Sequence, residues 1–426
     1  MLTAARLGAV ALSATLLAGA AAGPALADSP PSPSAAAPVP DGLYGKGDPK
    51  YDGVWRQSLA LTALAGAKVT PADSAVSWLT GQQCADGGWP SFRADTAAAC
   101  DATLEDSNAT AVAIQALVAL GGHQDAVDKG VQWLKANQNA DGSWAFNPGS
   151  PGDANSTGLA VNALFAAKTD PAGVAKAGKN AFDGLAFFQL GCAAPTDQQG
   201  AFFYQPKSDG ALEANGLATG QAALAAVGGK LPVANTNRTD AAPKALACAG
   251  GSDAAAKTVA RTDSGEAVGA YLAAQLAAGG QHLTLTTPGA APTPDYTATA
   301  WAALGLIQGG HPQQAAGAVD WLAKEGSAWT KGGTDASATA TLLLVAQAAQ
   351  RDPASFGGDL TAQLTALGPA PKATAATPSA TSASAPAKDE KKDGGIGQWW
   401  LIGVGLLIGI GGGLVLSLQR KRGARL

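Results

Sequence analysis

The sequence lacks any excess of positive charge, because 28 Lys and Arg residues stand against 32 Asp and Glu residues and the formal net charge is −4. Five basic residues lie at the two ends of the chain, outside the expected folded domain: Arg6, Arg420, Lys421, Arg422 and Arg425. Without these five charges the net charge becomes −9. Nucleic acids and anionic lipid surfaces are bound by positively charged surfaces. We therefore expect no nucleic-acid partner.

The first residues predict a signal peptide. Residues 1–27 carry a single positive charge, continue with the apolar run Leu7–Ala22, and end in Ala25-Leu26-Ala27, the small-x-small pattern of a cleavage site. A packed N-terminal helix is the alternative, but the Pro-, Ala- and Ser-rich stretch that follows offers such a helix nothing to pack on. We expect residues 28–44 to form a flexible segment.

The C-terminal end predicts a membrane anchor. Within residues 396–418, the run Trp399–Leu418 has no charged residue and is long enough to cross a bilayer. The basic residues of 419–426 place that end in the cytoplasm. Residues 369–395 are rich in Pro, Ala, Ser and Thr and predict a disordered tether. The ends therefore predict a single-pass protein of the cell membrane, with its N-terminal domain outside the cell.

Cysteine and histidine are scarce, with 4 and 3 residues, and no Cys-x-x-Cys occurs. Two of the three histidines are far from any cysteine in sequence, which makes a metal site the less favoured alternative. An even number of cysteines in an exported protein favours disulfides. We expect the pairs Cys84–Cys100 and Cys192–Cys248, the second as the simplest option.

Catalytic motifs are also missing. No Ser-His-Asp set, HExxH or phosphate-binding loop can be assembled from the sequence. No residue is therefore predicted to be catalytic, and enzymatic activity is the weaker hypothesis.

One segment recurs between the two ends. It opens with an acidic residue and small polar residues, and an apolar helix follows. The copies start at Asp52, Asp106, Asp153, Glu213, Asp295 and Asp335. The helices are apolar nearly all round, which predicts burial. Side-chain oxygens at a helix start accept bonds from free backbone N–H groups, so capping is the alternative to any binding role for these acids.

A second segment follows each of the first, with an aromatic residue, a Gln and an Asp-Gly turn closed by Trp. The clearest copies run from Trp78 to Trp89 and from Trp133 to Trp144, and weaker ones lie at 185–189, 268–275, 319–329 and 358–367. Repeats of this length predict stacked helical hairpins. Six inner and six outer helices would close into a ring. We therefore predict an all-α fold for residues 45–368, an α/α toroid.

The second segment resembles the QW motif of the prenyltransferase and squalene-oxidase repeat proteins. The copies that carry the resemblance are Trp78-Leu79…Gln82…Gly87-Gly88-Trp89 and Trp133-Leu134…Gln138…Gly142-Ser143-Trp144. The resemblance covers about residues 45–368 and implies an α/α toroid. Terpene cyclases of that superfamily use an Asp-x-Asp-Asp acid, which this sequence lacks, since the cluster from Asp101 to Asp106 has another spacing.

Protein prenyltransferases of the same superfamily hold zinc through Asp, Cys and His. Here His123 and His311 occupy the same place in their repeats, directly after a Gly-Gly pair. This repetition favours a capping role over a metal site, and no metal or cofactor is predicted.

The non-enzyme branch is that of the cobalamin carriers, similar to intrinsic factor and transcobalamin, in which inner-helix starts bind the ligand. The resemblance implies a ligand-binding role for Asp106, Asn108, Thr110, Asp153, Asn155, Thr157, Asn215, Asp295, Tyr296 and Asp335. We expect these residues to gather at one rim and to bind a small amphipathic ligand, with cobalamin or a similar corrinoid as the leading candidate. A membrane importer would then be the partner.

The carriers close their site with a small β domain that this sequence lacks. The insertions at Gly229–Asp263 and Leu283–Pro294 are the segments expected to cover the rim instead. Two alternatives to the receptor hypothesis stay open: a terpene cyclase or prenyltransferase-like enzyme, and a structural or protein-interaction module of the cell envelope.

Overall fold

The computed structural model describes residues 39–234, 238–239, 241–248, 259–286 and 289–373. The predicted signal peptide, transmembrane segment and basic tail lie outside the described residues, as do most of the N-terminal segment and of the tether. No helix of the described part is both long and apolar enough to cross a membrane.

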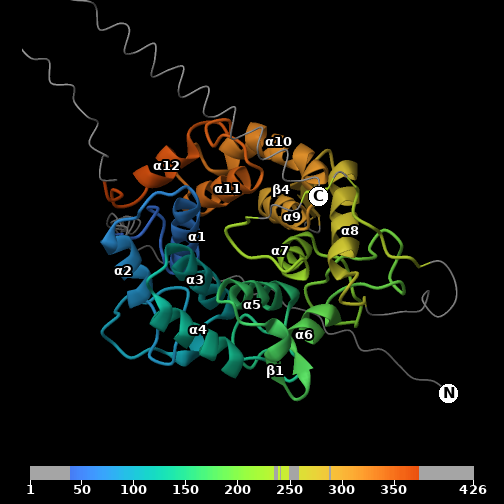
Figure 1. Cartoon of the computed structure of the whole chain (residues 1–426), viewed down its shortest axis with the longest axis horizontal. Helices are drawn as coiled ribbons and strands as arrows, with labels where there is room; N and C mark the ends of the chain where they lie inside the picture. The colour runs from blue at the N-terminus through green and yellow to red at the C-terminus, as the bar shows by residue number, and fades with distance from the viewer. Residues whose placement is uncertain (1–38, 235–237, 240, 249–258, 287–288, 374–426) are drawn as a thin grey trace, which may run out of the picture. The chain divides into compact units, whose positions relative to one another are not determined.

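The described residues form a ring of paired helices (Figure 1). The inner helices are α1 (Gly53–Gly66), α3 (Ser107–Leu120), α5 (Ala154–Ala166), α7 (Gly216–Ala226), α9 (Tyr296–Gln308) and α11 (Ala336–Ala348). The outer helices are α2 (Asp73–Gly81), α4 (Gln124–Ala136), α6 (Ala181–Phe187), α8 (Ser264–Ala278), α10 (Pro312–Trp329) and α12 (Leu360–Ala366). Each inner helix packs against the next, and α11 returns to α1. This arrangement agrees with the predicted toroid of six inner and six outer helices.

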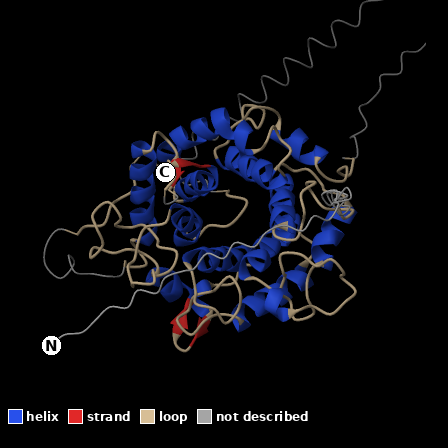
Figure 2. Ribbon diagram, turned by 180° about the vertical axis from the view of Figure 1, so that it is seen from behind, coloured by secondary structure: helices blue, strands red, loops and turns tan. Residues whose placement is uncertain are grey.

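Two hairpins and two short 3-10 helices complete the described structure (Figure 2). Strand β1 (Ala175–Lys176) pairs antiparallel with β2 (Lys179–Asn180), and β3 (Leu283–Leu285) pairs with β4 (Thr293–Asp295) so that Leu283 lies opposite Asp295. The 3-10 helices are η1 (Ala102–Leu104) and η2 (Pro171–Gly173).

Small side chains allow the inner helices to approach closely. A Cβ added to Gly158 of α5 would lie 2.9 Å from Cα of Ala222 in α7. All 13 residues of α9 are buried except Tyr296, Thr297 and Gln308. The Ala-rich composition of these helices therefore reflects burial on every side.

Acidic and amide side chains cap the inner helices, as predicted. The caps, with acceptor-to-nitrogen distances, are Asp106 to Ala109 (2.5 Å), Asp153 to Ser156 (2.7 Å), Asn215 to Ala218 (2.9 Å), Asp295 to Ala298 (2.8 Å) and Asp335 to Ala338 (3.1 Å). Two expected caps are absent. Glu213 leaves the capping of α7 to Asn215, and Asp52 makes an ion pair with Arg56 instead of a capping bond.

In the two clearest copies, the glutamine of the second segment joins its own turn to the backbone at or before the next outer helix. Gln138 donates from Nε2 to the carbonyls of Gly142 (3.0 Å) and Val174 (3.2 Å), and Gln83 donates in the same way to Gly87 and Ala126. The motif glutamine of the first copy is thus Gln83, and the assignment to Gln82 is corrected.

The prediction that the two histidines cap helices is wrong for their side chains. His123 and His311 stand at the N-caps of α4 and α10, but neither side chain makes a capping bond. The His311 ring contacts the Ala241 carbonyl (3.0 Å) and a Glu266 carboxylate oxygen (3.2 Å) instead.

The two insertions lie at opposite ends of the ring. The first contacts the C-terminal halves of inner helices, since Leu231 N donates to Gln115 Oε1 (2.8 Å) and Thr239 N donates to the Gly310 carbonyl (2.8 Å). The expectation that Gly229–Asp263 covers the rim at the helix starts is therefore wrong for its described residues. The second insertion carries β3 and β4 and does lie at that rim.

Candidate functional site

A cavity of about 1140 Å³ lies where the starts of inner helices converge. It is lined from α1, α3, α5 and α7, with Tyr271 and Gln275 of α8 and residues 284–286 of the second insertion. We call it the rim cavity. The N-terminal ends of the helices meet there because all inner helices of the ring run in the same direction.

The structure brings six of the ten predicted residues to this cavity: Asp106, Asn108, Asp153, Asn155, Asn215 and Asp295. The other four lie elsewhere. Thr110 and Thr157 are fully buried, and Tyr296 packs against the rings of Trp321 and Trp329. Asp335 caps α11 and pairs with Lys331 without lining the cavity.

The buried threonines have a structural task that the sequence did not reveal. Thr110 Oγ1 accepts the backbone N–H of Trp89 (2.9 Å), and Thr157 Oγ1 accepts that of Trp144 (3.0 Å). Thr219 holds Phe202 in the same way (3.0 Å). These threonines attach the loop after an outer helix to the following inner helix.

Two residues after each residue whose backbone N–H is bound by a threonine, a residue lines the rim cavity. These rim positions are Ser91, Phe146, Tyr204 and Leu285, which follow Trp89, Trp144, Phe202 and Leu283. Sequence reasoning missed all four. The spacing from the Asp-Gly-x-Trp turn could have found the first two, but the last two follow Phe and Leu, where the motif is degenerate.

The backbone of three rim positions is held on both sides. The Ser91 carbonyl accepts from Val54 N of α1 (2.9 Å), the Phe146 carbonyl from Ser107 N of α3 (2.9 Å), and the Tyr204 carbonyl from Ala154 N of α5 (3.2 Å). Each therefore caps the preceding inner helix while the nearby threonine holds it to the next one. The backbone of these three residues is therefore held in place, and their side chains line the cavity.

The lining is negatively charged. It contains Asp52, Asp106, Asp153, Asp197, Glu213 and Asp295, and among the described residues no Lys, Arg or His lines it. Asp52 pairs with Arg56 and Glu213 with Lys207. The other four carboxyl groups have no ion pair within the described part of the chain. We call these four the unpaired carboxyls.

Burial raises the pKa of two of the unpaired carboxyls, those of Asp106 and Asp153. It raises the pKa of Asp106 to about 6, although Ala109 N and Ser91 Oγ donate to this carboxyl and act in the opposite direction. Burial also raises the pKa of Asp153. A cation near either group would favour its ionised form.

Exposed apolar side chains gather around the same cavity. Seven large hydrophobic residues of the described part are exposed, and four of them line the cavity: Tyr51, Phe146, Tyr204 and Leu285. Isolated apolar residues on a surface are ordinary, whereas a group of them around a cavity marks a contact site.

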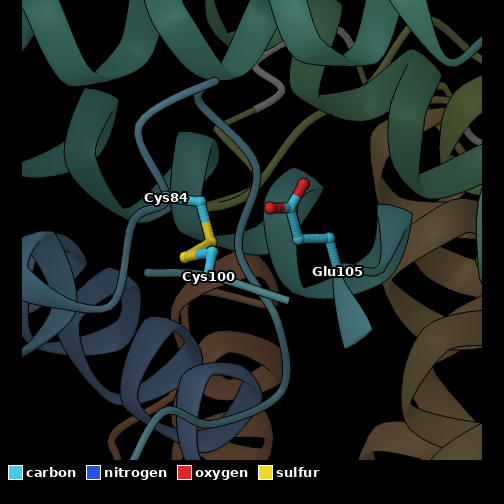
Figure 3. A group of neighbouring side chains, drawn as sticks. All are labelled: Cys84, Cys100 and Glu105. Carbon is cyan, nitrogen blue, oxygen red and sulfur yellow. A yellow bond between two sulfur atoms is a disulfide. The ribbon is translucent and has the colours of Figure 1, made fainter. Parts of the chain in front are cut away.

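Both predicted disulfides are present, Cys84–Cys100 and Cys192–Cys248. Glu105 lies beside the first disulfide (Figure 3). Together with Cys84 and Cys100 it forms the one cluster of three potential metal ligands among the described residues. Both sulfur atoms are bonded to each other, so neither is a thiolate ligand. The Glu105 carboxylate instead accepts a bond from Trp133 Nε1 (2.5 Å), and burial together with the charge of Asp86 raises its pKa to about 7.

The fold and the rim cavity define a class of protein, an α/α toroid of tandem repeats with a polar cavity at the starts of its inner helices. Residues 41–161 match the family model of the squalene-hopene cyclase C-terminal domain. No curated protein matches the chain. A crystal structure of a protein from Actinoplanes matches with a TM-score of 0.44 and 15% identity, over 74% of this chain and 95% of the other.

The family match supports the predicted relationship to the squalene-cyclase repeat proteins over α1 to α4 and the first part of α5. The resemblance to cobalamin carriers stays a prediction.

Proposed function

We propose that this protein binds a small amphipathic molecule, neutral or cationic, in the rim cavity. The observation that carries the proposal is the composition of the lining: six carboxyl side chains, amides from Asn and Gln, exposed apolar side chains, and no basic residue in the described part. Anionic substrates such as prenyl diphosphates would meet only like charge there, which disfavours prenyl transfer.

The size of the cavity supports a ligand larger than a typical drug. Pockets for such compounds have about 300–1,000 Å³, and the rim cavity has about 1140 Å³. A corrinoid fits these requirements, because its amide arms donate to carboxylate and amide oxygens and its ring offers broad faces to apolar side chains. Export and anchoring, as predicted from the two ends, would make the protein a cell-surface receptor that supplies a membrane importer.

Retention of cyanocobalamin tests this proposal. We expect the purified domain, mixed with cyanocobalamin and passed through a gel-filtration column, to elute with visible absorbance in the protein peak. Asn108→Ala combined with Asn155→Ala should raise the dissociation constant about thirtyfold and lower the retained amount, since two polar contacts of about 1 kcal/mol each are removed. Thr80→Ala, in α2 and outside the lining of the cavity, is the control and should retain as much as wild type. A colourless wild-type peak rejects cobalamin as the ligand.

A second candidate function is hydrocarbon cyclisation, which the family match over residues 41–161 favours. Asp106 is the buried carboxyl of the cavity with a pKa raised to about 6 and would be the acid of such a reaction. The motif Asp-x-Asp-Asp is absent, and the polar lining suits a hydrocarbon poorly.

Squalene separates the two candidates. We expect no cyclised product when the domain is incubated with squalene and the extract is examined by gas chromatography and mass spectrometry. A product that disappears with Asp106→Asn would replace binding by catalysis as the function.

A further inference from the structure

The rim cavity combines two features that select the charge and shape of its ligand. Phe146 and Tyr204 come from adjacent repeats and project from backbones that are held to inner helices on both sides. Both side chains are 44% exposed and line the cavity. The same cavity contains the four unpaired carboxyls and, in the described part of the chain, no basic group.

We infer that the rim cavity binds planar organic cations, with the aromatic rings of Phe146 and Tyr204 against the flat face of the ligand and the unpaired carboxyls opposite its positive charge. This inference rests on the proposed function and names its ligand class. Aromatic faces attract cations through the ring quadrupole, and flat ligands bury apolar area against them.

The burial of Asp106 and Asp153 supports a cationic ligand in particular. Their side chains are 2% and 1% exposed, yet the described structure offers neither a positively charged partner. The hydrogen bonds that each carboxyl accepts offset only part of the cost of burying its ionised form, and a cation would offset more. Burial raises the pKa of the Tyr204 hydroxyl, and the nearby Asp153 carboxylate raises it further. The aromatic and acidic parts of the site are therefore adjacent.

Two amides of the lining offer further acceptors. Asn108 Oδ1 and Asn155 Oδ1 have no hydrogen-bond partner in the described structure, and Asn155 Nδ2 donates to Gln221 Oε1 (2.7 Å). Rotation about the terminal torsion, which is broad for Asn, would turn Asn108 Oδ1 toward an N–H donor of a ligand, and in Asn155 it would exchange the bond to Gln221 for one to the ligand. An aromatic cation that carries amino groups would satisfy both.

Two dyes of opposite charge test the inference. Thioflavin T is a planar aromatic cation, and anilinonaphthalene sulfonate is an aromatic anion of similar size. We expect the domain at pH 7.5 to bind thioflavin T, measured by its fluorescence increase, and to bind the anionic dye at least tenfold more weakly. Phe146→Ala with Tyr204→Ala should weaken thioflavin T about tenfold. Leu104→Ala, which removes an exposed apolar side chain outside the cavity, is the matched control and should have no effect.

Acidity provides a second readout. Because a cationic ligand favours the ionised carboxyls, thioflavin T binding should weaken as the pH falls below about 6, where Asp106 takes up a proton. Equal binding of both dyes, or thioflavin T binding unchanged in the Phe146 and Tyr204 double variant, would overturn the inference. Binding of thioflavin T without binding of cyanocobalamin would support the inference and reject the corrinoid as ligand. Binding of cyanocobalamin without binding of thioflavin T would reject planar cations as the ligand class and leave the proposed function standing.

Discussion

Gly142→Ala is expected to destabilise the domain by about 2 to 5 kcal/mol, measured as the free energy of unfolding in denaturant with the disulfides intact. Gly142 has φ = +87°, which costs an L-residue about 1–2 kcal/mol. A Cβ there would also collide with the carbonyl oxygen of Asn180, at the N-cap of α6. Overpacking of this kind adds about 1–3 kcal/mol.

Gly149 is the matched control for this prediction. It has nearly the same backbone conformation, with φ = +83°, but an added Cβ would meet no atom within 4 Å. Gly149→Ala should therefore cost only about 1–2 kcal/mol, which is the conformational part. Equal losses for the two variants would mean that the turn and α6 are not in tight contact.

The same contact recurs around the ring. Gly87 has φ = +106° and lies against the Lys129 carbonyl, and Gly200 has φ = +86° and lies against the Ala267 carbonyl. The glycine of the repeat motif is thus required both by backbone conformation and by the close approach of the next outer helix.

The second large effect concerns pH. We expect the domain to be more stable at pH 5 than at pH 7.5, because burial raises the pKa of Glu105 to about 7 and that of Asp106 to about 6. The folded state then binds more protons than the unfolded state between about pH 4 and 7, so the free energy of unfolding falls as the pH rises through this range. With allowance for solvent screening, the loss is on the order of 2 kcal/mol for each group.

Glu105→Gln and Asp106→Asn isolate the two groups. Each amide can still accept the bond that its carboxylate accepts, from Trp133 Nε1 and from Ala109 N respectively. Each variant should therefore remove part of the fall in the free energy of unfolding with rising pH. Glu105→Gln should remove the part that extends to about pH 7, and Asp106→Asn the part that extends to about pH 6. Asp101→Asn is the control of opposite sign, since Thr103 lowers the pKa of that exposed carboxyl. A domain that is more stable at pH 7.5 than at pH 5 would contradict the prediction.

Part of the candidate site was predictable because capping and convergence follow from local patterns. An acidic or amide residue before an apolar helix predicts a cap, and helices repeated in one direction bring their starts together. Asp106, Asn108, Asp153, Asn155, Asn215 and Asp295 were found in this way. Thr110 and Thr157 belong to the same sequence motif, but one turn of helix rotates them into contact with the loop backbone. Sequence spacing alone does not tell which side of a buried helix faces a cavity.

The rim positions show the opposite limitation. Tyr204 and Leu285 stand in loops without a clear motif. Only the bonds that Phe202 N donates to Thr219 Oγ1 and Leu283 N donates to Thr299 Oγ1 reveal that they are equivalent to Phe146. The insertion after Gly229 likewise has no pattern that assigns it to one end of the ring. Its place is decided by the contact between Leu231 and Gln115, which are 116 residues apart in sequence.

The sequence by itself determined the mostly helical fold, the number of helical pairs, the disulfide partners and the caps of most inner helices. These features depend on periodicity and on groups close together along the chain, where the physical rules are local. Only the tertiary structure decided which polar residues face the rim cavity, which glutamine joins its turn to the following repeat, and which end each insertion occupies. Those outcomes depend on how the ring closes. Closure brings together residues that are far apart in the chain, and no sequence pattern predicts their contact.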